Sequence, residues 1–189
     1  FELRMSLVPY LYSAFEEYQK TGLPPVSAVV MEYPQDEAAR NLDDEYFFGK
    51  DLLVCPLTLE DGTSREVYLP EGNWYNFFTG EKIEGGRRLV LEADWNEMLV
   101  FARDGALVPV AEPVICVTED TVFNITVKSF GTNKTGSCVL YEDDFVSFNY
   151  ESLVAKKQIN VTVGDNGKFI VSGAKTSTKY HFLNCIVKD

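Results

Sequence analysis

Neighbouring acidic residues are the groups in this chain best suited by type to catalysis. Asp143 and Asp144 form the clearest pair, because two carboxylates can share the work of protonating and attacking a substrate. Successive side chains of a strand point to opposite faces, so these two carboxylates are expected to diverge instead of flanking one bond. We therefore predict that the pair is not catalytic, and we predict no catalytic residue elsewhere in the chain.

Metal and cofactor sites are not predicted either. The acidic segment 35–44 is expected to be a loop or a poor helix. It lacks the regular oxygen-ligand spacing of a calcium loop, so a solvated segment is expected there in place of a cation site. The four Cys lie far apart, form no C-x-x-C pair and are accompanied by a single His, a combination that fits no zinc site. Buried free thiols are one interpretation of these Cys, and a bridge from Cys138 to Cys116 or Cys185 is the alternative for an exported protein.

The overall charge restricts the partners of the chain. It has 17 basic and 29 acidic residues, which gives a formal net charge of -12. This surplus repels phosphate backbones and anionic membrane surfaces, so neither nucleic acid nor a membrane is expected as a partner. No run approaches the roughly 18 apolar residues of a membrane span.

The first 57 residues carry a helical pattern that gives way to strands. Apolar residues between positions 7 and 18 keep to one helical face, with Ser6 as the expected N-cap, Pro9 in the first turn and Gly22 as the C-cap. A longer helix kinked at Pro9 is the alternative. A β-branched run at 26–31 predicts a buried strand, and a second is predicted at 52–54, where Pro56 stops it.

The remaining chain is typical of an all-β protein, with turn pairs such as Asp61-Gly62 and Glu71-Gly72 about every ten residues. A first set of strands is predicted at 65–69, 74–78, 88–91, 98–102 and 105–110. A second set is predicted at 114–117, 123–130, 137–142, 154–163, 169–172 and 181–187. The clearest hairpin joins 159–163 to 169–171 through Asn166-Gly167. The sequence thus predicts two consecutive antiparallel β-sandwiches.

Three tripeptides match the acceptor pattern for N-linked glycans, beginning at Asn124, Asn133 and Asn160. Each match covers only three residues in a chain rich in Asn and Thr. A chance origin is therefore the simpler interpretation of all three.

The order of several longer motifs resembles glycoside hydrolase family 31, which includes α-glucosidases and α-xylosidases. The motifs are LVPYLY from Leu7, GLP from Gly22, MEYPQD from Met31, FGKDLLVCP from Phe48, VYLPEGNWY from Val67, TG at Thr79 and LYEDD from Leu140. They span residues 4 to about 144, and their common order is more specific than any one of them. Because the chain starts at Phe1 in the middle of a pattern, it is expected to be a piece of a longer protein.

The resemblance implies three segments. Residues 1–50 would be the end of a catalytic (β/α)8 barrel, 51–112 a proximal C-terminal β-sandwich and 113–189 a distal one. It also implies that the parent protein is a retaining, exo-acting α-glycosidase that hydrolyses terminal α-linked glucose or xylose. Its catalytic carboxylates would precede Phe1, so this piece would be structural, with the rest of the barrel as its partner and an oligosaccharide substrate bound through the parent.

Two positions depart from the family pattern. Ser27-Ala28 stands where the family usually has Arg-Pro, which puts the usual substrate preference in doubt, and the activity with it. Phe145 stands where a Gly normally follows the two Asp residues, so a different turn is expected there, because Phe lacks the backbone freedom of Gly.

A stand-alone carbohydrate-binding module and a purely structural pair of domains are the competing hypotheses. The first would bind sugar on aromatic rings at Trp74, Tyr75, Phe77 or Trp95. A sugar platform needs two aromatic side chains on one exposed face. Trp74 and Phe77 are expected on opposite faces of a strand, which favours core packing for at least one of them.

Overall fold

The computed structural model describes residues 1–58, 63–93, 97–131, 137–143, 157–163, 168–173 and 177–188. The chain forms two compact units. Unit 1 consists of Phe1–Gly22, Leu107–Ser129 and Asn133–Val187, and unit 2 of Leu23–Ala106, Phe130–Thr132 and Lys188–Asp189. This division differs from the three segments predicted from the sequence, whose boundaries remain predictions.

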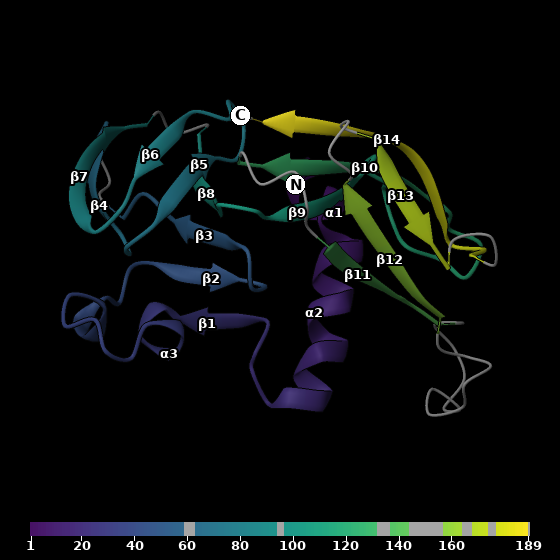
Figure 1. Ribbon diagram of the computed structural model, residues 1–189, viewed down its shortest axis with the longest axis horizontal. Helices are drawn as coiled ribbons and strands as arrows, with labels where there is room; N and C mark the ends of the chain where they lie inside the picture. Colours follow the sequence, from purple (N-terminus) through teal and green to yellow (C-terminus); the bar gives the residue numbers. More distant parts are fainter. Residues whose placement is uncertain are drawn as a thin grey trace. The chain divides into compact units, whose positions relative to one another are not determined.

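Unit 2 is a β-sandwich of a six-stranded and a two-stranded antiparallel sheet (Figure 1). The larger sheet has the order β1-β2-β3-β8-β5-β6, with β1 at Val26–Ala28, β2 at Tyr46–Phe48, β3 at Leu52–Cys55, β8 at Leu99–Arg103, β5 at Asn73–Asn76 and β6 at Lys82–Glu84. The smaller sheet pairs β4 (Ser64–Leu69) with β7 (Arg87–Glu92). Two short helical segments, α3 (Val29–Glu32) and the 3-10 helix η1 (Ala39–Asn41), connect β1 to β2.

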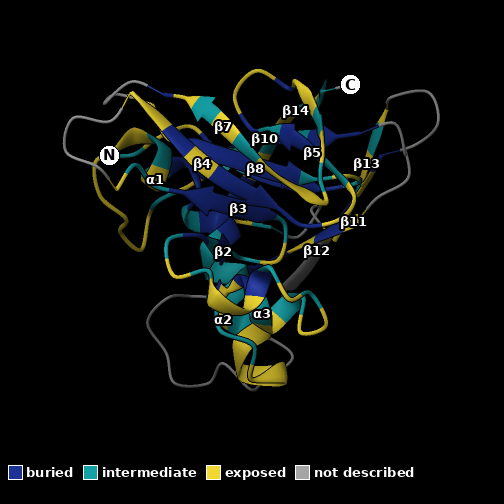
Figure 2. Ribbon diagram, turned by 90° about the vertical axis from the view of Figure 1, so that its left-hand side faces the viewer, coloured by how far each residue is buried: buried dark blue, intermediate teal, exposed yellow. Residues whose placement is uncertain are grey.

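The core of unit 2 lies between these sheets. Leu53 and Phe101 from the larger sheet and Val67 and Leu69 from the smaller one are fully buried in one apolar cluster. Figure 2 shows β3 and β8, the middle strands of the larger sheet, as buried. The predicted mainly β, sandwich-type fold is therefore confirmed.

Unit 1 packs two helices with two three-stranded sheets. Helix α1 spans Glu2–Ser6 and α2 spans Val8–Thr21; the sheets have the orders β14-β10-β9 and β11-β12-β13. The strands are β9 (Leu107–Ala111), β10 (Phe123–Phe130), β11 (Ser137–Glu142), β12 (Lys157–Val163), β13 (Phe169–Ser172) and β14 (Tyr180–Lys188). Both sheets contribute to one core, in which Ile125, Leu140 and Val161 are fully buried, and α2 contacts β9 and β11 (Figure 1).

The helix boundaries agree with the sequence at one end and differ at the other. Gly22 caps α2 in the left-handed conformation (φ 77°), and Pro9 lies in the first turn, as predicted. Ser6 is not the N-cap, because its hydroxyl donates to the Glu2 carbonyl inside α1 (2.9 Å) and Leu7 separates the two helices. The alternative prediction, a longer helix kinked at Pro9, is closer to the observed arrangement than a single helix capped by Ser6.

Three strand predictions require correction. The run 26–31 ends as a strand at Ala28, because Val29 starts a helical turn closed by the Tyr33 amide, which donates to the Val29 carbonyl (3.0 Å) and lets Val29 enter the core. Residues 114–117 form no strand, and Cys116 among them is exposed. Strand β9, assigned from the sequence to the first set, pairs with β10 of the second.

Candidate functional site

The aromatic residues considered as a sugar platform are buried. Trp74, Tyr75 and Phe77 are each 1% exposed. Strand β5 ends at Asn76, whose side-chain oxygen accepts from the Phe78 and Thr79 amides and turns the chain. The alternation expected between Trp74 and Phe77 therefore stops before Phe77, and both rings enter the interior. Trp95 lies outside the described residues.

The acidic residues at the end of β11 are engaged inside unit 1. The Tyr12 hydroxyl of α2 donates to Asp143 Oδ2 at 2.6 Å. Burial first, and then the neighbouring Asp143 carboxylate, raise the pKa of Tyr12 far above its ordinary value, so this hydroxyl keeps its proton and remains a donor. Asp144 and Phe145 lie outside the described residues. Asp143 is thus a partner of helix α2.

Glu142 is the most completely paired carboxylate of this region. It is 3% exposed, and its two oxygens accept from the Ser177 hydroxyl (2.6 Å), the Thr178 amide (3.0 Å) and the Thr178 hydroxyl (3.0 Å). A buried carboxylate without such donors would carry a large desolvation penalty. Glu142 therefore fixes the chain that leads into β14 against the end of β11.

Tyr141 completes this arrangement through its backbone and its ring. Its amide donates to the Ser13 hydroxyl of α2 (2.9 Å), its carbonyl accepts from the Tyr180 hydroxyl (2.7 Å), and its ring lies 5.5 Å from that of Tyr12. We call residues 140–143 the β11 clamp. Each of its polar groups named here binds another element of unit 1, so Glu142 and Asp143 are held by contacts within that unit.

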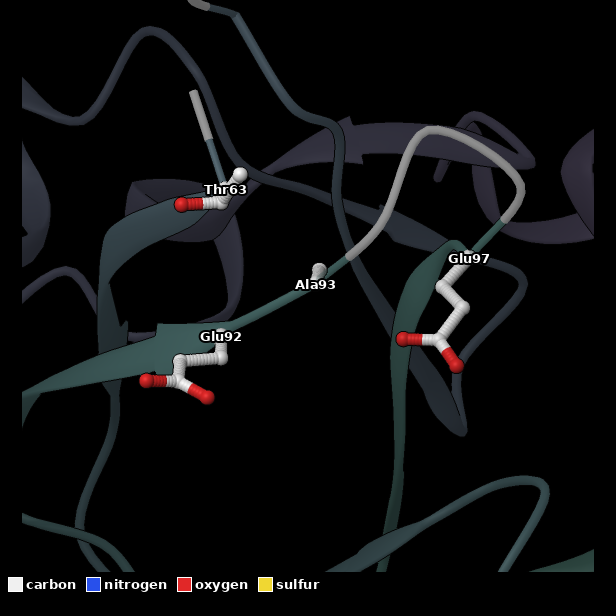
Figure 3. A pocket seen from close by; sticks show the side chains of 4 residues that line it. All are labelled: Thr63, Glu92, Ala93 and Glu97. Atoms are coloured by element: carbon white, nitrogen blue, oxygen red, sulfur yellow. The ribbon is translucent and has the colours of Figure 1, made fainter. Parts of the chain in front are cut away.

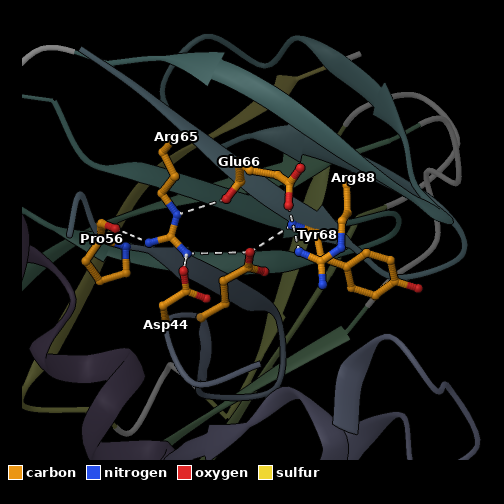
Figure 4. Close-up of polar contacts among 7 residues, drawn as sticks. Asp44, Pro56, Arg65, Glu66, Tyr68 and Arg88 are labelled. Carbon is orange, nitrogen blue, oxygen red and sulfur yellow. Dashed lines mark hydrogen bonds and ion pairs between the residues drawn. The ribbon is translucent and has the colours of Figure 1, made fainter. Parts of the chain in front are cut away.

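A second polar cluster in unit 2 is centred on Arg65 of β4 (Figure 4). The Arg65 side chain is 5% exposed. Its guanidinium lies 2.8 Å from Asp44 Oδ2 and 3.6 Å from Glu45 Oε1, and it also donates to the carbonyls of Pro56 and Glu66. Asp44 and Glu45 precede β2, Pro56 follows β3, and Glu66 lies in β4 itself. Arg65 thus joins the loop before β2 to the smaller sheet.

Glu45 is less well paired than Arg65. Its Oε1 accepts from the Tyr68 amide at 2.8 Å, but its buried Oε2 has no hydrogen-bond partner among the described residues. Burial raises the pKa of Glu45 to about 7, although the Tyr68 amide and Arg65 oppose the shift. The adjacent Cys55 thiol is buried, and burial followed by the Glu45 charge raises its pKa. Neither group has the lowered pKa of a nucleophile.

Arg103 forms a third cluster at the end of β8. Its guanidinium lies 3.1 Å from Glu32 Oε2, and its central carbon lies 4.4 Å from the centre of the Phe47 ring and 5.6 Å from that of Tyr33. Cation–π contacts of this kind hold an Arg in place without full burial. The cluster attaches the helical turn α3 to the larger sheet.

One open hollow of about 290 Å³ is lined by Thr63, Glu92, Ala93 and Glu97 (Figure 3). The two Glu side chains come from the end of β7 and from the segment before β8, and both are exposed. The described lining holds no aromatic ring.

The described residues hold no group of three or more His, Cys, Asp or Glu suited to a metal ion. None of the four Cys, all of which the structure describes, forms a disulfide: Cys55 and Cys138 are buried, Cys185 is half-buried and Cys116 is exposed. Among the described helices none combines the length and the apolar character needed to span a bilayer.

The sequence did not predict the Glu45–Arg65 cluster or the β11 clamp. Both include pairs of residues 20 or more positions apart, and no local periodicity reports such pairs. A signal for Arg65 was present, because an Arg at an alternating, otherwise apolar position of a strand requires a buried partner.

Comparison with known proteins connects these features to a family. The model of the family described as Glycosyl hydrolase family 31 C-terminal domain matches residues 22–108. Alpha-glucosidase 2 of Bacillus thermoamyloliquefaciens is 34% identical over 172 residues, which cover 90% of this chain and 22% of that protein. An alpha-xylosidase of Saccharolobus solfataricus is 33% identical, over 79% of this chain and 20% of its own length.

Solved structures give the same result. A GH31 dextranase of Flavobacterium johnsoniae, solved with glucose, has a TM-score of 0.79 and 33% identity, over 90% of this chain and 21% of its own. In sequence and fold the chain is therefore similar to the C-terminal portion of glycoside hydrolase family 31 proteins. It spans only about a fifth of the length of these relatives.

Proposed function

We propose that this chain is a structural, non-catalytic C-terminal portion of a longer retaining, exo-acting α-glycosidase that releases terminal α-linked glucose or xylose. The observation that carries the proposal is the β11 clamp, in which Glu142 and Asp143 are both committed to contacts inside unit 1. A retaining glycosidase needs two carboxyl groups about 5 Å apart across the glycosidic bond. The names of the relatives, alpha-glucosidase and alpha-xylosidase, support the substrate class.

The partner that we propose for this portion is the catalytic barrel of the longer protein. Helix α2 has one face toward β9 and β11, while Phe15 and Tyr18 on another face are 50% and 46% exposed. Large apolar side chains three positions apart on one helix form a stripe that is suited to a protein partner. The greater length of the relatives supports a covering segment from the same longer protein.

Activity assays on this chain and on a longer protein that contains it test the proposal. With aryl α-glucosides and α-xylosides, we expect no turnover by the chain, and turnover by the longer protein with retained anomeric configuration, read by NMR of the first product. Turnover by the chain that is lost in Asp143→Asn would overturn the structural role. A longer protein without turnover on either substrate would overturn the proposed activity, and the departure at Ser27-Ala28 would then be the first position to test.

The partner is tested by charging the exposed stripe. Phe15→Asp should leave the stability of this chain nearly unchanged, because the ring is half exposed in it. The same change should lower the stability and activity of the longer protein, where the ring would be covered. Glu17→Asp, an exposed and conservative change on the same helix, is the matched control. An equal response of the longer protein to both changes would contradict the proposed contact.

For the competing function, a carbohydrate-binding module, the aromatic residues that the structure describes at the predicted positions do not form a sugar platform. Burial of Trp74, Tyr75 and Phe77 leaves these rings unable to stack on a sugar. No second function is therefore proposed.

A further inference from the structure

The structure separates the three possible glycan acceptors by their surroundings. Asn124 lies half-buried on β10, its amide nitrogen donates to Glu112 Oε2 at 2.7 Å, and its oxygen lies 3.2 Å from His181 Nδ1. A sugar on that nitrogen would have to displace this arrangement. Asn133 lies outside the described residues.

Asn160 has different surroundings. It lies on β12, the central strand of the sheet β11-β12-β13, and both Asn160 and the pattern's hydroxyl residue Thr162 are exposed on the same face. The intervening Val161 is fully buried in the core of unit 1. Among the described residues no hydrogen bond of the Asn160 side chain is seen, and its backbone carbonyl faces the Ser172 hydroxyl at 3.5 Å.

The residues that pair with Asn160 and Thr162 across the sheet are all uncharged. Val139 lies opposite Asn160 in the β11–β12 pairing, and Ile170 lies opposite Thr162 in the β12–β13 pairing. Side chains directly opposite each other in an antiparallel sheet lie on the same face. Val139 is 43% exposed and Ile170 is 62% exposed, so two apolar side chains border the acceptor on its two sides.

We propose that Asn160 is an N-glycosylation site and that the first sugars of its glycan cover Val139 and Ile170. The Asn160 amide nitrogen would form a bond to C1 of a lipid-pyrophosphate-linked oligosaccharide. The C1–O bond to the pyrophosphate would break, with lipid pyrophosphate as the leaving group and the amide proton passing to a base. The sugar then projects from a solvent-facing strand position, where its bulk requires no change in the core. The proposal does not depend on the proposed function.

The site is tested on the full chain behind a secretion signal in a eukaryotic host. Intact mass before and after peptide N-glycosidase treatment, with peptide mapping, reports occupancy at each Asn. We expect a glycan at Asn160 in the wild-type chain, its retention in Asn124→Gln and Thr162→Ser, and its loss in Asn160→Gln and Thr162→Ala. An unmodified Asn160 peptide in the wild-type chain, or an unchanged glycan mass in Asn160→Gln, would overturn the proposal.

A second measurement removes the dependence on folding and export. Translation of the same variants with endoplasmic-reticulum microsomes shows glycan addition as an endoglycosidase-sensitive gel shift, whether or not the chain folds. We expect the shift in a variant that keeps only the Asn160 pattern. Its absence there would overturn the proposal even if the secreted chain could not be recovered.

A separate measurement tests whether the glycan covers Val139 and Ile170. Enzymatic removal of the glycan from the folded protein should increase the binding of an apolar fluorescent dye, and Ile170→Thr with Val139→Thr should reduce that increase. If the dye binds equally before and after removal, the sugars do not cover these side chains, and that part of the proposal is wrong.

Discussion

Two buried carboxylates, Glu142 and Glu45, meet different surroundings. Glu142 receives three hydrogen bonds, whereas Glu45 receives one amide donor and leaves Oε2 without a partner among the described residues. Arg65 does not need Glu45 as its counterion, because Asp44 lies closer to the Arg65 guanidinium, at 2.8 Å against 3.6 Å for Glu45. Glu45 can therefore take up a proton without leaving Arg65 uncompensated.

The stability of unit 2 should fall as pH rises through this titration. The pKa of Glu45 is raised from 4.5 to about 7, so the folded state holds the proton more tightly than the unfolded state does. Between these values unfolding releases a proton, and stability declines by up to about 3 kcal/mol at roughly 1.4 kcal/mol per pH unit. Glu45→Gln should flatten this decline in urea denaturation followed by tryptophan fluorescence.

The control is the same substitution at Glu66, the residue after Arg65 on β4. Glu66→Gln changes an exposed side chain, 56% accessible, that pairs with the exposed Arg88 at 2.9 Å. Such surface pairs contribute about 0 to 1 kcal/mol. The pH dependence of Glu66→Gln should match that of the wild-type chain, and an identical slope in Glu45→Gln would show that Glu45 is not the titrating group.

Tyr12 should contribute more to stability than Tyr18, another tyrosine of helix α2. Its hydroxyl donates to the Asp143 carboxylate, and bonds to charged groups contribute about 1.5 to 3 kcal/mol. Tyr12→Phe should therefore lower the free energy of unfolding of unit 1 by roughly that amount. Tyr18→Phe removes the hydroxyl of a side chain that is 46% exposed and should change little. Equal effects of the two changes in urea denaturation would argue against the β11 clamp as an anchor for the helix.

At the scale of elements, the end of helix α2 depends on one glycine. Gly22 has φ 77°, and a methyl group built on it would meet no atom within 4 Å. Gly22→Ala should therefore cost only the backbone penalty of the left-handed conformation, about 1 to 2 kcal/mol. Gly22→Asn should cost less, because Asn tolerates that conformation. The measurement is the midpoint of thermal unfolding, followed by circular dichroism. Midpoints equal to that of the wild-type chain in both variants would contradict this assignment.

The elements predicted well from the sequence are those with clear local signals. The strands 123–130, 137–142 and 169–172 have the predicted bounds, because each is a strand-length run, alternating in 123–130 and mostly apolar in the other two. The β12–β13 pairing was predicted from the Asn166-Gly167 turn signal. Strand β6 was missed, because its three residues, Lys82–Glu84, carry too short a pattern.

The remaining differences arise from contacts that local patterns do not encode. Val29 leaves the predicted strand because a helical turn places it in the core of unit 2, and Phe77 turns inward because Asn76 ends β5. For the candidate site, the motif LYEDD was found from the sequence, but the partners of Glu142 and Asp143 were not. Those partners, Thr178 and Tyr12, lie 36 and 131 residues away.

At the scale of the whole molecule, the two units have separate apolar cores. Leu53 belongs to the cluster of unit 2 and Leu140 to that of unit 1, and the two clusters share no buried residue. The chain crosses between the units more than once, since unit 1 contains both Phe1–Gly22 and Leu107–Ser129. Separate cores favour independent unfolding, whereas a repeatedly crossing chain favours coupling.

We expect the separate cores to dominate, so that each unit responds to its own core substitution. Leu53→Ala and Leu140→Ala remove fully buried side chains, and each should destabilise its unit by about 2 to 5 kcal/mol. Both tryptophans of the chain, Trp74 and Trp95, lie in the range of unit 2, so their fluorescence in urea reports on that unit. Labelling of the buried Cys138 thiol, resolved by peptide mass spectrometry, reports on unit 1, and labelling of Cys55 on unit 2. Leu53→Ala should shift the fluorescence and the Cys55 transition while Cys138 labelling stays unchanged, and Leu140→Ala should do the reverse. If either substitution shifts all three probes together, the two units unfold as one.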